Sequence, residues 1–199
     1  MRRATRIAAP VSVVALATSM LAGAALLTAE PVGAVPSGCT MVGTSGDDVL
    51  KGTAGKDVLC GLGGDDQLFG KGGNDVLYGG DGRDQLWGGR GNDGLIGGAN
   101  NDVAYAGAGD DEIDAGPGND RGIGGRGDDR LFGSLGRDFL YGWSGTDLVK
   151  GGGGADTCLA TYDGDGDDTV VGGPGRDVYF IDPGDRHFTV ERSISCVGG

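Results

Sequence analysis

The sequence predicts an all-β solenoid, in which short strands stack along one axis around a narrow core. A nine-residue unit repeats along most of the chain, beginning as GTSGDDVLK at Gly43 and continuing as GTAGKDVLC and GLGGDDQLF without a gap. Position 6 of the unit is always Asp, position 4 is Gly with the exception of Asn100, and position 8 is mostly aliphatic. A period this short is typical of a solenoid and not of a globular core.

Residues 1–34 are predicted to be a signal peptide. Three arginines within the first six residues precede an apolar stretch, residues 7–29, and the small residues 32–34 form a cleavage site. An uncleaved membrane anchor is the alternative, because the apolar stretch is nearly long enough to span a bilayer. Cleavage would make Val35 the first mature residue. The mature chain would then have no membrane span and would be secreted, either free or associated with the cell wall.

The remaining chain divides into a repeat region and two caps. Fifteen units occupy residues 43–180, interrupted by three extra residues at 160–162. Residues 35–42 are predicted to form an N-terminal cap and residues 181–199 a C-terminal cap, because the ends of a solenoid need covers.

Each unit is expected to form a Gly-Asp turn followed by a three-residue strand. Position 4 should be a turn residue with positive φ, because Asn is the residue that best replaces Gly there. Position 8 should point its aliphatic side chain inward and position 9 should point outward. Two units have little to bury, since position 8 is Ala104 in one and Gly122 in the other. We therefore expect the seventh to ninth units to be the least protected part of the solenoid.

The position-6 carboxylates indicate bound cations. One aliphatic side chain per unit offsets little of the entropy lost in ordering a Gly-rich turn, and stacked carboxylates repel one another when unpaired. A hard cation between turns removes this repulsion. Calcium takes about six to eight oxygen ligands from carboxylates and backbone carbonyls, whereas magnesium dehydrates reluctantly. The residues concerned are Asp48, Asp57, Asp66, Asp75, Asp84, Asp93, Asp102, Asp111, Asp120, Asp129, Asp138, Asp147, Asp156, Asp168 and Asp177.

The units GGRGNDGLI and GGRGDDRLF resemble the RTX nonapeptide GGxGxDxUx of haemolysin-type proteins, in which U is aliphatic. The resemblance covers residues 43–180. It implies a right-handed parallel β-roll with two nonapeptides per turn and multiple Ca²⁺ ions between turns on each side of the roll. It also implies that the position-6 Asp residues are the main side-chain ligands. Loop carbonyls and acidic residues at positions 3 and 5 would assist, namely Asp47, Asp65, Asp81, Asp110, Asp128, Asp165 and Asp167.

The chain departs from many RTX proteins in two ways. Its predicted export signal is N-terminal, whereas many RTX proteins carry a C-terminal secretion signal. Almost nothing lies outside the repeats, whereas many RTX proteins attach them to a lipase, protease or toxin domain. In both respects the chain is similar to the short, exported, actinobacterial-type proteins built of repeats and terminal cysteines.

Four cysteines remain after the predicted cleavage and are expected to form two disulfides. With two units per turn, Cys60 and Cys158 lie roughly 26 Å apart along the roll, at about 4.8 Å per strand. A disulfide tolerates a Cα separation of only about 4.4–6.8 Å. We therefore predict the pairs Cys39–Cys60 and Cys158–Cys196, one at each end. A lipid-modified Cys39 is an alternative, and zinc is disfavoured because the cysteines lack CxxC spacing.

Charge and missing motifs disfavour other classes of function. A formal net charge of −13 disfavours binding to nucleic-acid phosphates. No HExxH or GxSxG motif occurs, and a single His cannot build most catalytic triads, so no enzyme activity is expected. The sequence thus predicts an exported, non-enzymatic protein with a structural or interaction role, which folds when it binds calcium outside the cell.

Aromatic residues at position 9 suggest a second function. Phe69, Trp87, Tyr105 and Tyr141 would stack as one outward-facing ladder. An adhesin or cell-wall module would bind wall glycans, or a second copy of the chain, through this face. The reading that we favour is that the ladder stabilises strand pairing.

Overall fold

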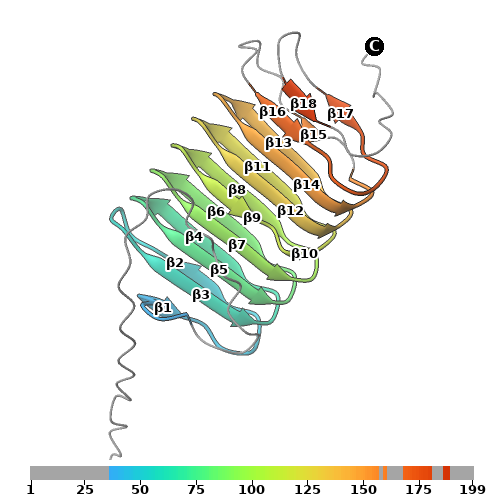
Figure 1. Ribbon diagram of the computed structural model, residues 1–199. Helices are drawn as coiled ribbons and strands as arrows, with labels where there is room; N and C mark the ends of the chain where they lie inside the picture. The colour runs from blue at the N-terminus through green and yellow to red at the C-terminus, as the bar shows by residue number, and fades with distance from the viewer. Residues whose placement is uncertain (1–35, 157–158, 161–167, 181–185, 189–199) are drawn as a thin grey trace, which may run out of the picture.

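The protein folds into two parallel β-sheets that stack their strands along a common axis (Figure 1). The computed structural model describes residues 36–156, 159–160, 168–180 and 186–188. Within these ranges the strands form one ten-stranded and one eight-stranded sheet, and no helix occurs. The predicted all-β solenoid is confirmed.

The two sheets take alternate strands of the chain. The ten-stranded sheet contains β1 (Met41–Val42), β3 (Val58–Gly63), β5 (Val76–Asp81), β7 (Gly94–Ala99), β9 (Glu112–Asp114), β10 (Pro117–Gly118), β12 (Arg130–Gly136), β14 (Leu148–Gly154), β16 (Thr169–Val171) and β18 (Arg186–Phe188). The eight-stranded sheet contains β2 (Val49–Lys51), β4 (Gln67–Gly72), β6 (Gln85–Arg90), β8 (Val103–Ala108), β11 (Arg121–Arg126), β13 (Phe139–Ser144), β15 (Leu159–Ala160) and β17 (Tyr179–Phe180).

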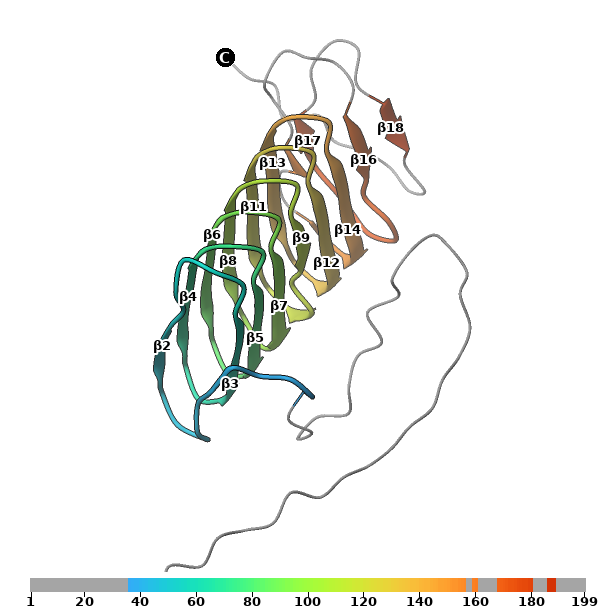
Figure 2. The ribbon, with the colours of Figure 1, turned by 90° about the vertical axis from the view of Figure 1, so that its left-hand side faces the viewer.

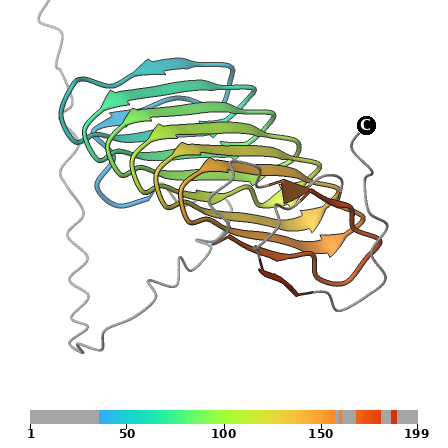
Figure 3. The same cartoon turned by 90° about the horizontal axis from the view of Figure 1, so that it is seen from above.

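Two nonapeptides form one turn of the solenoid, as predicted. Leu59 pairs with Leu77 in the first sheet, and Leu68 pairs with Leu86 in the second. Figure 2 shows the chain passing from one sheet to the other and back in each turn. Seen from above, each turn is flat, with two strands joined by tight bends at the two edges (Figure 3).

The core between the sheets consists of aliphatic side chains, and both sheets contribute to it. Position 8 of the unit points inward, as expected, and its largest members are fully buried. Burial of each such side chain contributes about 1.5–3 kcal/mol. These residues are Leu59, Leu68, Leu77, Leu86, Leu95, Ile113, Leu131, Leu140, Val149 and Val170.

Most strands are longer than the three residues expected. β4 and several others contain six residues, because strand pairing continues from position 9 through positions 1 to 3 of the following unit. In these long strands position 2 has positive φ, 83° at Leu62 and 82° at Lys71. Position 2 therefore lies in the left-handed region, as position 4 does in most units. The prediction for position 4 is confirmed in most of the described units, including Asn100 with a φ of 82°, but Gly46, Gly55 and Gly118 do not have positive φ. The residues at position 2 still pair with position 2 of the next turn, as Leu62 does with Gly80 and Lys71 with Gly89.

The ten-stranded sheet is interrupted in the middle of the roll. β9 ends at Asp114, and β10 resumes the pairing with β12 at Pro117. Ala115 and Gly116 between them belong to no strand.

Neighbouring side chains fill the space beside Gly122, where position 8 has no side chain. A Cβ added to Gly122 would lie 2.9 Å from Leu140 Cδ2 and 3.5 Å from Ile113 Cγ2. The small residue at this point therefore does not leave an empty core.

Both ends of the ten-stranded sheet extend beyond residues 43–180. Met41 in β1 pairs with Leu59, and β18 pairs with β16 as the last strand of the sheet. A disulfide joins Cys39 to Cys60 at the N-terminal end, with a Cα separation of 6.1 Å.

The extra residues near the C-terminus are placed differently from the expectation. Tyr141 pairs with Ala160, although an 18-residue spacing would pair it with Leu159. One extra residue therefore precedes Ala160 and the others follow it, instead of all three lying at 160–162. The neighbouring apolar residues 159 and 160 fit the repeat equally well, so the sequence does not distinguish them.

Several predictions concern residues outside the described ranges. These are the signal peptide at residues 1–34, the Cys158–Cys196 disulfide, and the proposed ligands Asp165 and Asp167.

Candidate metal centre

The Asp at position 6 of the units is buried along two rows, one on each side of the roll. Asp48, at the N-terminal end of one row, is half-buried. The buried members are Asp57, Asp66, Asp75, Asp84, Asp93, Asp102, Asp111, Asp120, Asp129, Asp138, Asp147, Asp156, Asp168 and Asp177, none of them more than 6% exposed.

Hydrogen bonds link each row into a ladder. From Asp66 onward, Oδ1 of each Asp in a row accepts the backbone N–H of the Asp one turn earlier. Asp75 N–H donates to Asp93 Oδ1 at 2.8 Å, and Asp93 N–H donates to Asp111 Oδ1 at 2.7 Å. In the other row, Asp84 N–H donates to Asp102 Oδ1 at 2.8 Å. Each carboxylate therefore has one oxygen committed to the neighbouring turn.

The second carboxylate oxygen, Oδ2, is buried without a hydrogen-bond partner in most of these residues. Burying an ionised group without a partner costs several kcal/mol even after relaxation. The ionised roll therefore needs a cation, or a proton, beside each of these oxygens. The residues are Asp66, Asp75, Asp84, Asp93, Asp102, Asp111, Asp120, Asp129, Asp138, Asp156 and Asp177.

Position 1 is mostly Gly because oxygen atoms occupy the space beside it. A Cβ added to Gly70 would lie 2.5 Å from Asp75 Oδ2 and 2.7 Å from the carbonyl oxygen of Gly88. A Cβ added to Gly88 would lie 2.5 Å from Asp93 Oδ2 and 2.6 Å from the carbonyl oxygen of Ala106. A carboxylate oxygen and a carbonyl oxygen of the next turn therefore converge on one point beside each of these glycines.

Two units in the middle of the roll carry Ala at position 1. Ala106 and Ala115 are buried, and Asp111 and Asp120 stand at position 6 of the same units. These two units have a methyl group where most other units have the hydrogen of glycine. We therefore expect the sites at Asp111 and Asp120 to offer less room for an ion.

Burial raises the pKa of these carboxyl groups most strongly in the middle of the roll. It raises the pKa of Asp102 and Asp129 to about 8, although the backbone N–H at Oδ1 opposes the shift. The pKa of Asp111 and of Asp120 is raised to about 7 by the same cause. Burial raises the pKa to about 6 in Asp84, Asp93 and Asp138. A proton therefore competes with a cation for the same oxygen.

The available donors fit calcium. Within the described ranges, no three His, Cys, Asp or Glu side chains gather into one potential metal site. An ion in a turn would therefore combine carboxylate oxygen with backbone carbonyl oxygen, which is a calcium donor set and not the Cys and His set of zinc. The position-6 Asp and the position-1 carbonyl of the next turn are the groups that would hold it.

The acidic residues at positions 3 and 5 are exposed. Those that the structure describes are Asp47, Asp65, Asp81, Asp110 and Asp128.

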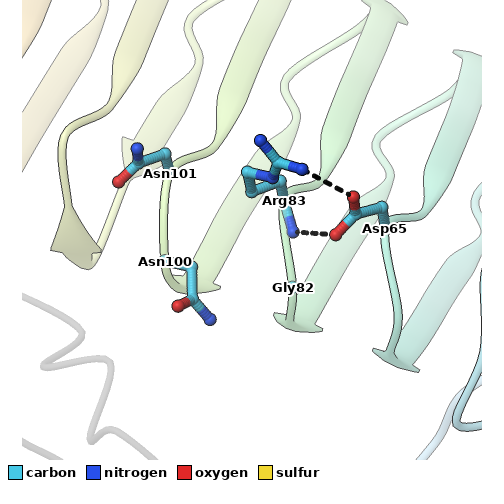
Figure 4. Close-up of a pocket in the computed structure, with 5 residues that line it drawn as sticks. All are labelled: Asp65, Gly82, Arg83, Asn100 and Asn101. Carbon is cyan, nitrogen blue, oxygen red and sulfur yellow. Dashed lines mark hydrogen bonds and ion pairs between the residues drawn. The ribbon is translucent and has the colours of Figure 1, made fainter.

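The position-5 side chains link turns in the opposite direction from the position-6 ladder. Asp65 N–H donates to Asp47 Oδ1 at 2.8 Å, and Arg83 N–H donates to Asp65 Oδ1 at 2.9 Å (Figure 4). The Arg83 guanidinium also lies 3.4 Å from Asp65 Oδ2. Asn serves equally well, since Asn92 N–H donates to Asn74 Oδ1 at 3.1 Å. The recurrence of Asp and Asn at position 5 was the sequence signal for this ladder.

The first two units differ from the rest in a way that the repeat pattern did not reveal. Oδ2 of Asp48 and Oδ2 of Asp57 each accept hydrogen bonds from the Thr at position 2 of the same unit, Thr44 and Thr53. The hydrogen bonds from Thr53 hold the pKa of Asp57 below its ordinary value.

The aromatic ladder stands on the outer face of the eight-stranded sheet. The rings of Phe69 and Trp87 are stacked with centroids 4.4 Å apart, and those of Trp87 and Tyr105 are stacked at 6.3 Å. Lys51 Nζ lies over the Phe69 ring, 5.8 Å from its centroid. Tyr141 continues the same register two strands further on. Both faces of the Trp87 ring therefore meet neighbouring rings.

Parallel sheets joined by turns that bury an Asp every nine residues define a class of repeat β-solenoid. The family model of the RTX calcium-binding nonapeptide repeat matches residues 40–68, 61–95, 95–122, 123–158 and 162–185. The chain therefore belongs to the RTX calcium-binding nonapeptide repeat family, as the resemblance implied, and its solenoid is a β-roll. A search of curated proteins finds no match.

Proposed function

We propose that this protein is an exported, non-enzymatic calcium-binding roll that folds as calcium fills its turns. The observation that carries the proposal is the recurring buried Asp with an unpaired Oδ2. That oxygen converges with a backbone carbonyl oxygen of the next turn, as at Asp75 and Gly88. Calcium supplies the positive charge that both oxygens lack.

The balance of energies makes folding depend on the ion. A buried leucine contributes about 1.5–3 kcal/mol, which is comparable to the cost of burying an unpaired carboxylate in the same unit. Ion binding removes that cost, so binding free energy becomes folding free energy. Extracellular calcium modules typically bind with dissociation constants of about 10⁻⁴–10⁻³ M. The chain would therefore stay unfolded inside the cell and fold outside it.

Export is supported by the sequence of the first 34 residues, with its basic start, apolar stretch and small residues at 32–34. The described part of the chain has no helix that could cross a membrane. Purification of the protein from culture medium and N-terminal sequencing test this step. Val35 is the expected first residue, and an intact Met1 on membrane-bound protein would contradict export by cleavage.

A calcium titration followed by far-ultraviolet circular dichroism tests ion-dependent folding. We expect little strand signal in excess chelator at neutral pH and a cooperative gain of strand as calcium is added. Magnesium at the same concentration is the matched control and should give much less strand, because it gives up its water ligands reluctantly. The same strand signal in chelator and in calcium would contradict the proposal.

The stacking geometry supports the structural role of the aromatic ladder over a glycan-binding role. A glycan platform needs free ring faces, whereas Trp87 stacks against Phe69 on one side and Tyr105 on the other. Stacked aromatic pairs across neighbouring strands stabilise pairing. Comparing the wild type with Trp87→Ala tests this, because we expect lower stability and unchanged retention on wall glycan.

A further inference from the structure

We propose that the first turn of the roll, residues 43–60, is a cap that does not bind calcium, in which Thr44 and Thr53 take the place of the cation beside Asp48 and Asp57. The calcium-dependent part of the roll then begins with the third unit. The inference rests on the proposed function for those later units. It removes two of the predicted aspartates from the set of metal ligands.

Threonine saturates the carboxylate oxygen that is unpaired elsewhere. Asp48 Oδ2 accepts the Thr44 N–H at 2.6 Å and the Thr44 hydroxyl at 2.9 Å. Asp57 Oδ2 accepts the Thr53 N–H at 2.6 Å and the Thr53 hydroxyl at 2.8 Å. A carboxylate oxygen has about two lone-pair positions, so both are taken in these two residues.

The same threonines close the turn around themselves. Gly46 N–H donates to the Thr44 hydroxyl oxygen at 3.2 Å, and Gly55 N–H donates to the Thr53 hydroxyl oxygen at 3.1 Å. Each hydroxyl therefore joins the position-4 backbone to the position-6 carboxylate. A bound cation would have to displace this arrangement.

Backbone conformation separates these two units from the others. From the third unit onward, position 2 has positive φ in every unit where the structure describes it, for example at Leu62 and Lys71, but not at Thr44 or Thr53. Ser134 provides an internal comparison, because it carries a hydroxyl at position 2 but has a φ of 75°.

The Ser134 hydroxyl donates to Asp114 Oδ1 at 3.1 Å, and Oδ2 of Asp138 in its own unit stays unpaired. A hydroxyl at position 2 is therefore not sufficient. The two units in which neither position 2 nor position 4 has positive φ are the ones whose position-2 N–H and hydroxyl reach the carboxylate.

A covalent bond holds the same segment together. The Cys39–Cys60 disulfide joins two residues 21 apart in the sequence, and such a bond stabilises a fold by restricting the unfolded chain. Thr40 adds a polar contact, because its hydroxyl accepts the Val58 N–H at 2.9 Å. The cap therefore has covalent and hydrogen-bonded support from residues that precede the repeats.

The cap is linked to the first calcium-dependent turn by the ladder. Asp48 N–H donates to Asp66 Oδ1 at 2.7 Å, and Asp57 N–H donates to Asp75 Oδ1 at 2.8 Å. A folded cap would thus present two oriented N–H donors on which the third and fourth units dock when calcium arrives.

The first test counts calcium ions bound per full-length chain at saturation by equilibrium dialysis and elemental analysis. The variant Asp48→Ala with Asp57→Ala should bind as many ions as the wild type. The matched variant Asp66→Ala with Asp75→Ala should bind fewer. An equal loss of ions in the two double variants would overturn the inference.

The second test measures amide exchange in excess chelator with the disulfide intact. We expect the Thr44 and Thr53 amides to exchange more slowly than in an unfolded chain, and Thr44→Val with Thr53→Val to speed them several-fold. Thr146→Val, at an exposed position 5, is the matched control and should change nothing there. Exchange of the two wild-type amides at unfolded-chain rates would overturn the inference.

The two tests separate this inference from the proposed function. A wild-type chain that binds no calcium would refute the proposed function. The exchange test needs no calcium and still decides whether the first turn is folded without an ion.

Discussion

The N-terminal half of the roll and its middle, units seven to nine, share the carboxylate ladder but differ in their cores. The third to sixth units bury Leu68, Leu77, Leu86 and Leu95 completely. The seventh and ninth units have Ala104 and Gly122 at the same position. The carboxylate ladder nevertheless passes through unchanged, with 2.8 Å from Asp84 N to Asp102 Oδ1 and 2.8 Å from Asp102 N to Asp120 Oδ1.

Strand register and hydrophobic stabilisation are therefore determined by separate positions of the unit. Gly and Asp at the edges fix the register, and position 8 in the centre supplies hydrophobic stabilisation. The middle also has the most strongly raised pKa values and the two position-1 alanines, Ala106 and Ala115. That the seventh to ninth units exchange their amides fastest stays a prediction.

The largest expected effect comes from pH, because many carboxyl groups act together. Their folded pKa values lie above the ordinary value, so the folded chain without calcium binds more protons than the unfolded chain, and its stability rises as the pH falls. In excess chelator, we expect strand signal to grow from about pH 8 to about pH 5. As the pH falls, carboxyl groups in the middle of the roll should take up protons first, since the pKa of Asp102 is about 8 and that of Asp84 is about 6.

Circular dichroism in chelator and carboxyl carbon shifts by nuclear magnetic resonance measure this pH effect. As the pH falls over the same range, the calcium concentration at half-folding should fall, because protons also stabilise the folded roll. The apparent dissociation constant of the folded roll for calcium should rise, because protons and calcium compete for the same oxygens. A strand signal in chelator that stays constant across that range would contradict the prediction.

The next largest effect compares the core of the N-terminal half with the core of the middle of the roll. Leu86→Ala removes a fully buried side chain and should lower the free energy of unfolding by about 2–5 kcal/mol. Ala104→Gly in the middle should cost only about 0.5–1 kcal/mol, mainly through backbone entropy. Urea unfolding in saturating calcium measures both. Equal costs would show that the middle packs as tightly as the N-terminal half.

A smaller effect is expected where the oxygens converge. Gly88→Ala places a Cβ 2.5 Å from Asp93 Oδ2 and should cost about 1–3 kcal/mol while weakening calcium binding. Gly94→Ala is the matched control, because nothing lies within 4 Å of its added Cβ. The reverse change in the middle, Ala106→Gly, should tighten calcium binding. Calorimetric titration with calcium would contradict the idea if Gly88→Ala bound as tightly as Gly94→Ala.

The smallest effect is expected at Gly122. In Gly122→Ala the added Cβ meets only the flexible end of Leu140, so the gain in backbone rigidity should nearly offset the shift and change stability by less than about 0.5 kcal/mol. Gly125→Ala in the same strand is the control and should be strongly destabilising, because its φ is 123° and the Gly107 carbonyl blocks the Cβ. Urea unfolding in saturating calcium measures both variants. Equal free energies of unfolding for Gly122→Ala and Gly125→Ala would contradict this prediction.

The period of the sequence was sufficient to predict the solenoid and the inward aliphatic side chains, whereas the two-unit turn was implied by the RTX resemblance. It was not sufficient for strand length, because pairing through positions 1 to 3 depends on stacked backbones and not on side-chain preference. It also did not reveal why position 1 is Gly, since the oxygens that exclude a Cβ at Gly70 come from Asp75 and from the next turn.

The main candidate ligands were predicted because Asp recurs at position 6. The differences among these Asp residues could not be predicted from that recurrence. The distinction at Asp48 and Asp57 depends on the φ of Thr44 and Thr53, which the repeat pattern does not encode. The exposure of position 5 likewise depends on where the turn ends, which the repeat pattern does not show. That acidic residues at position 5 assist calcium binding stays a prediction.

The lengthened turn near the C-terminus has a consequence for how such a chain changes in evolution. Asp147 and Asp168 are 21 residues apart, yet the Asp147 N–H still donates to Asp168 Oδ1 at 2.7 Å. Extra residues between strands are thus accommodated without shifting the row. The ladder stays intact across three extra residues here, so we expect a longer loop grafted at this point to leave the Asp row in register.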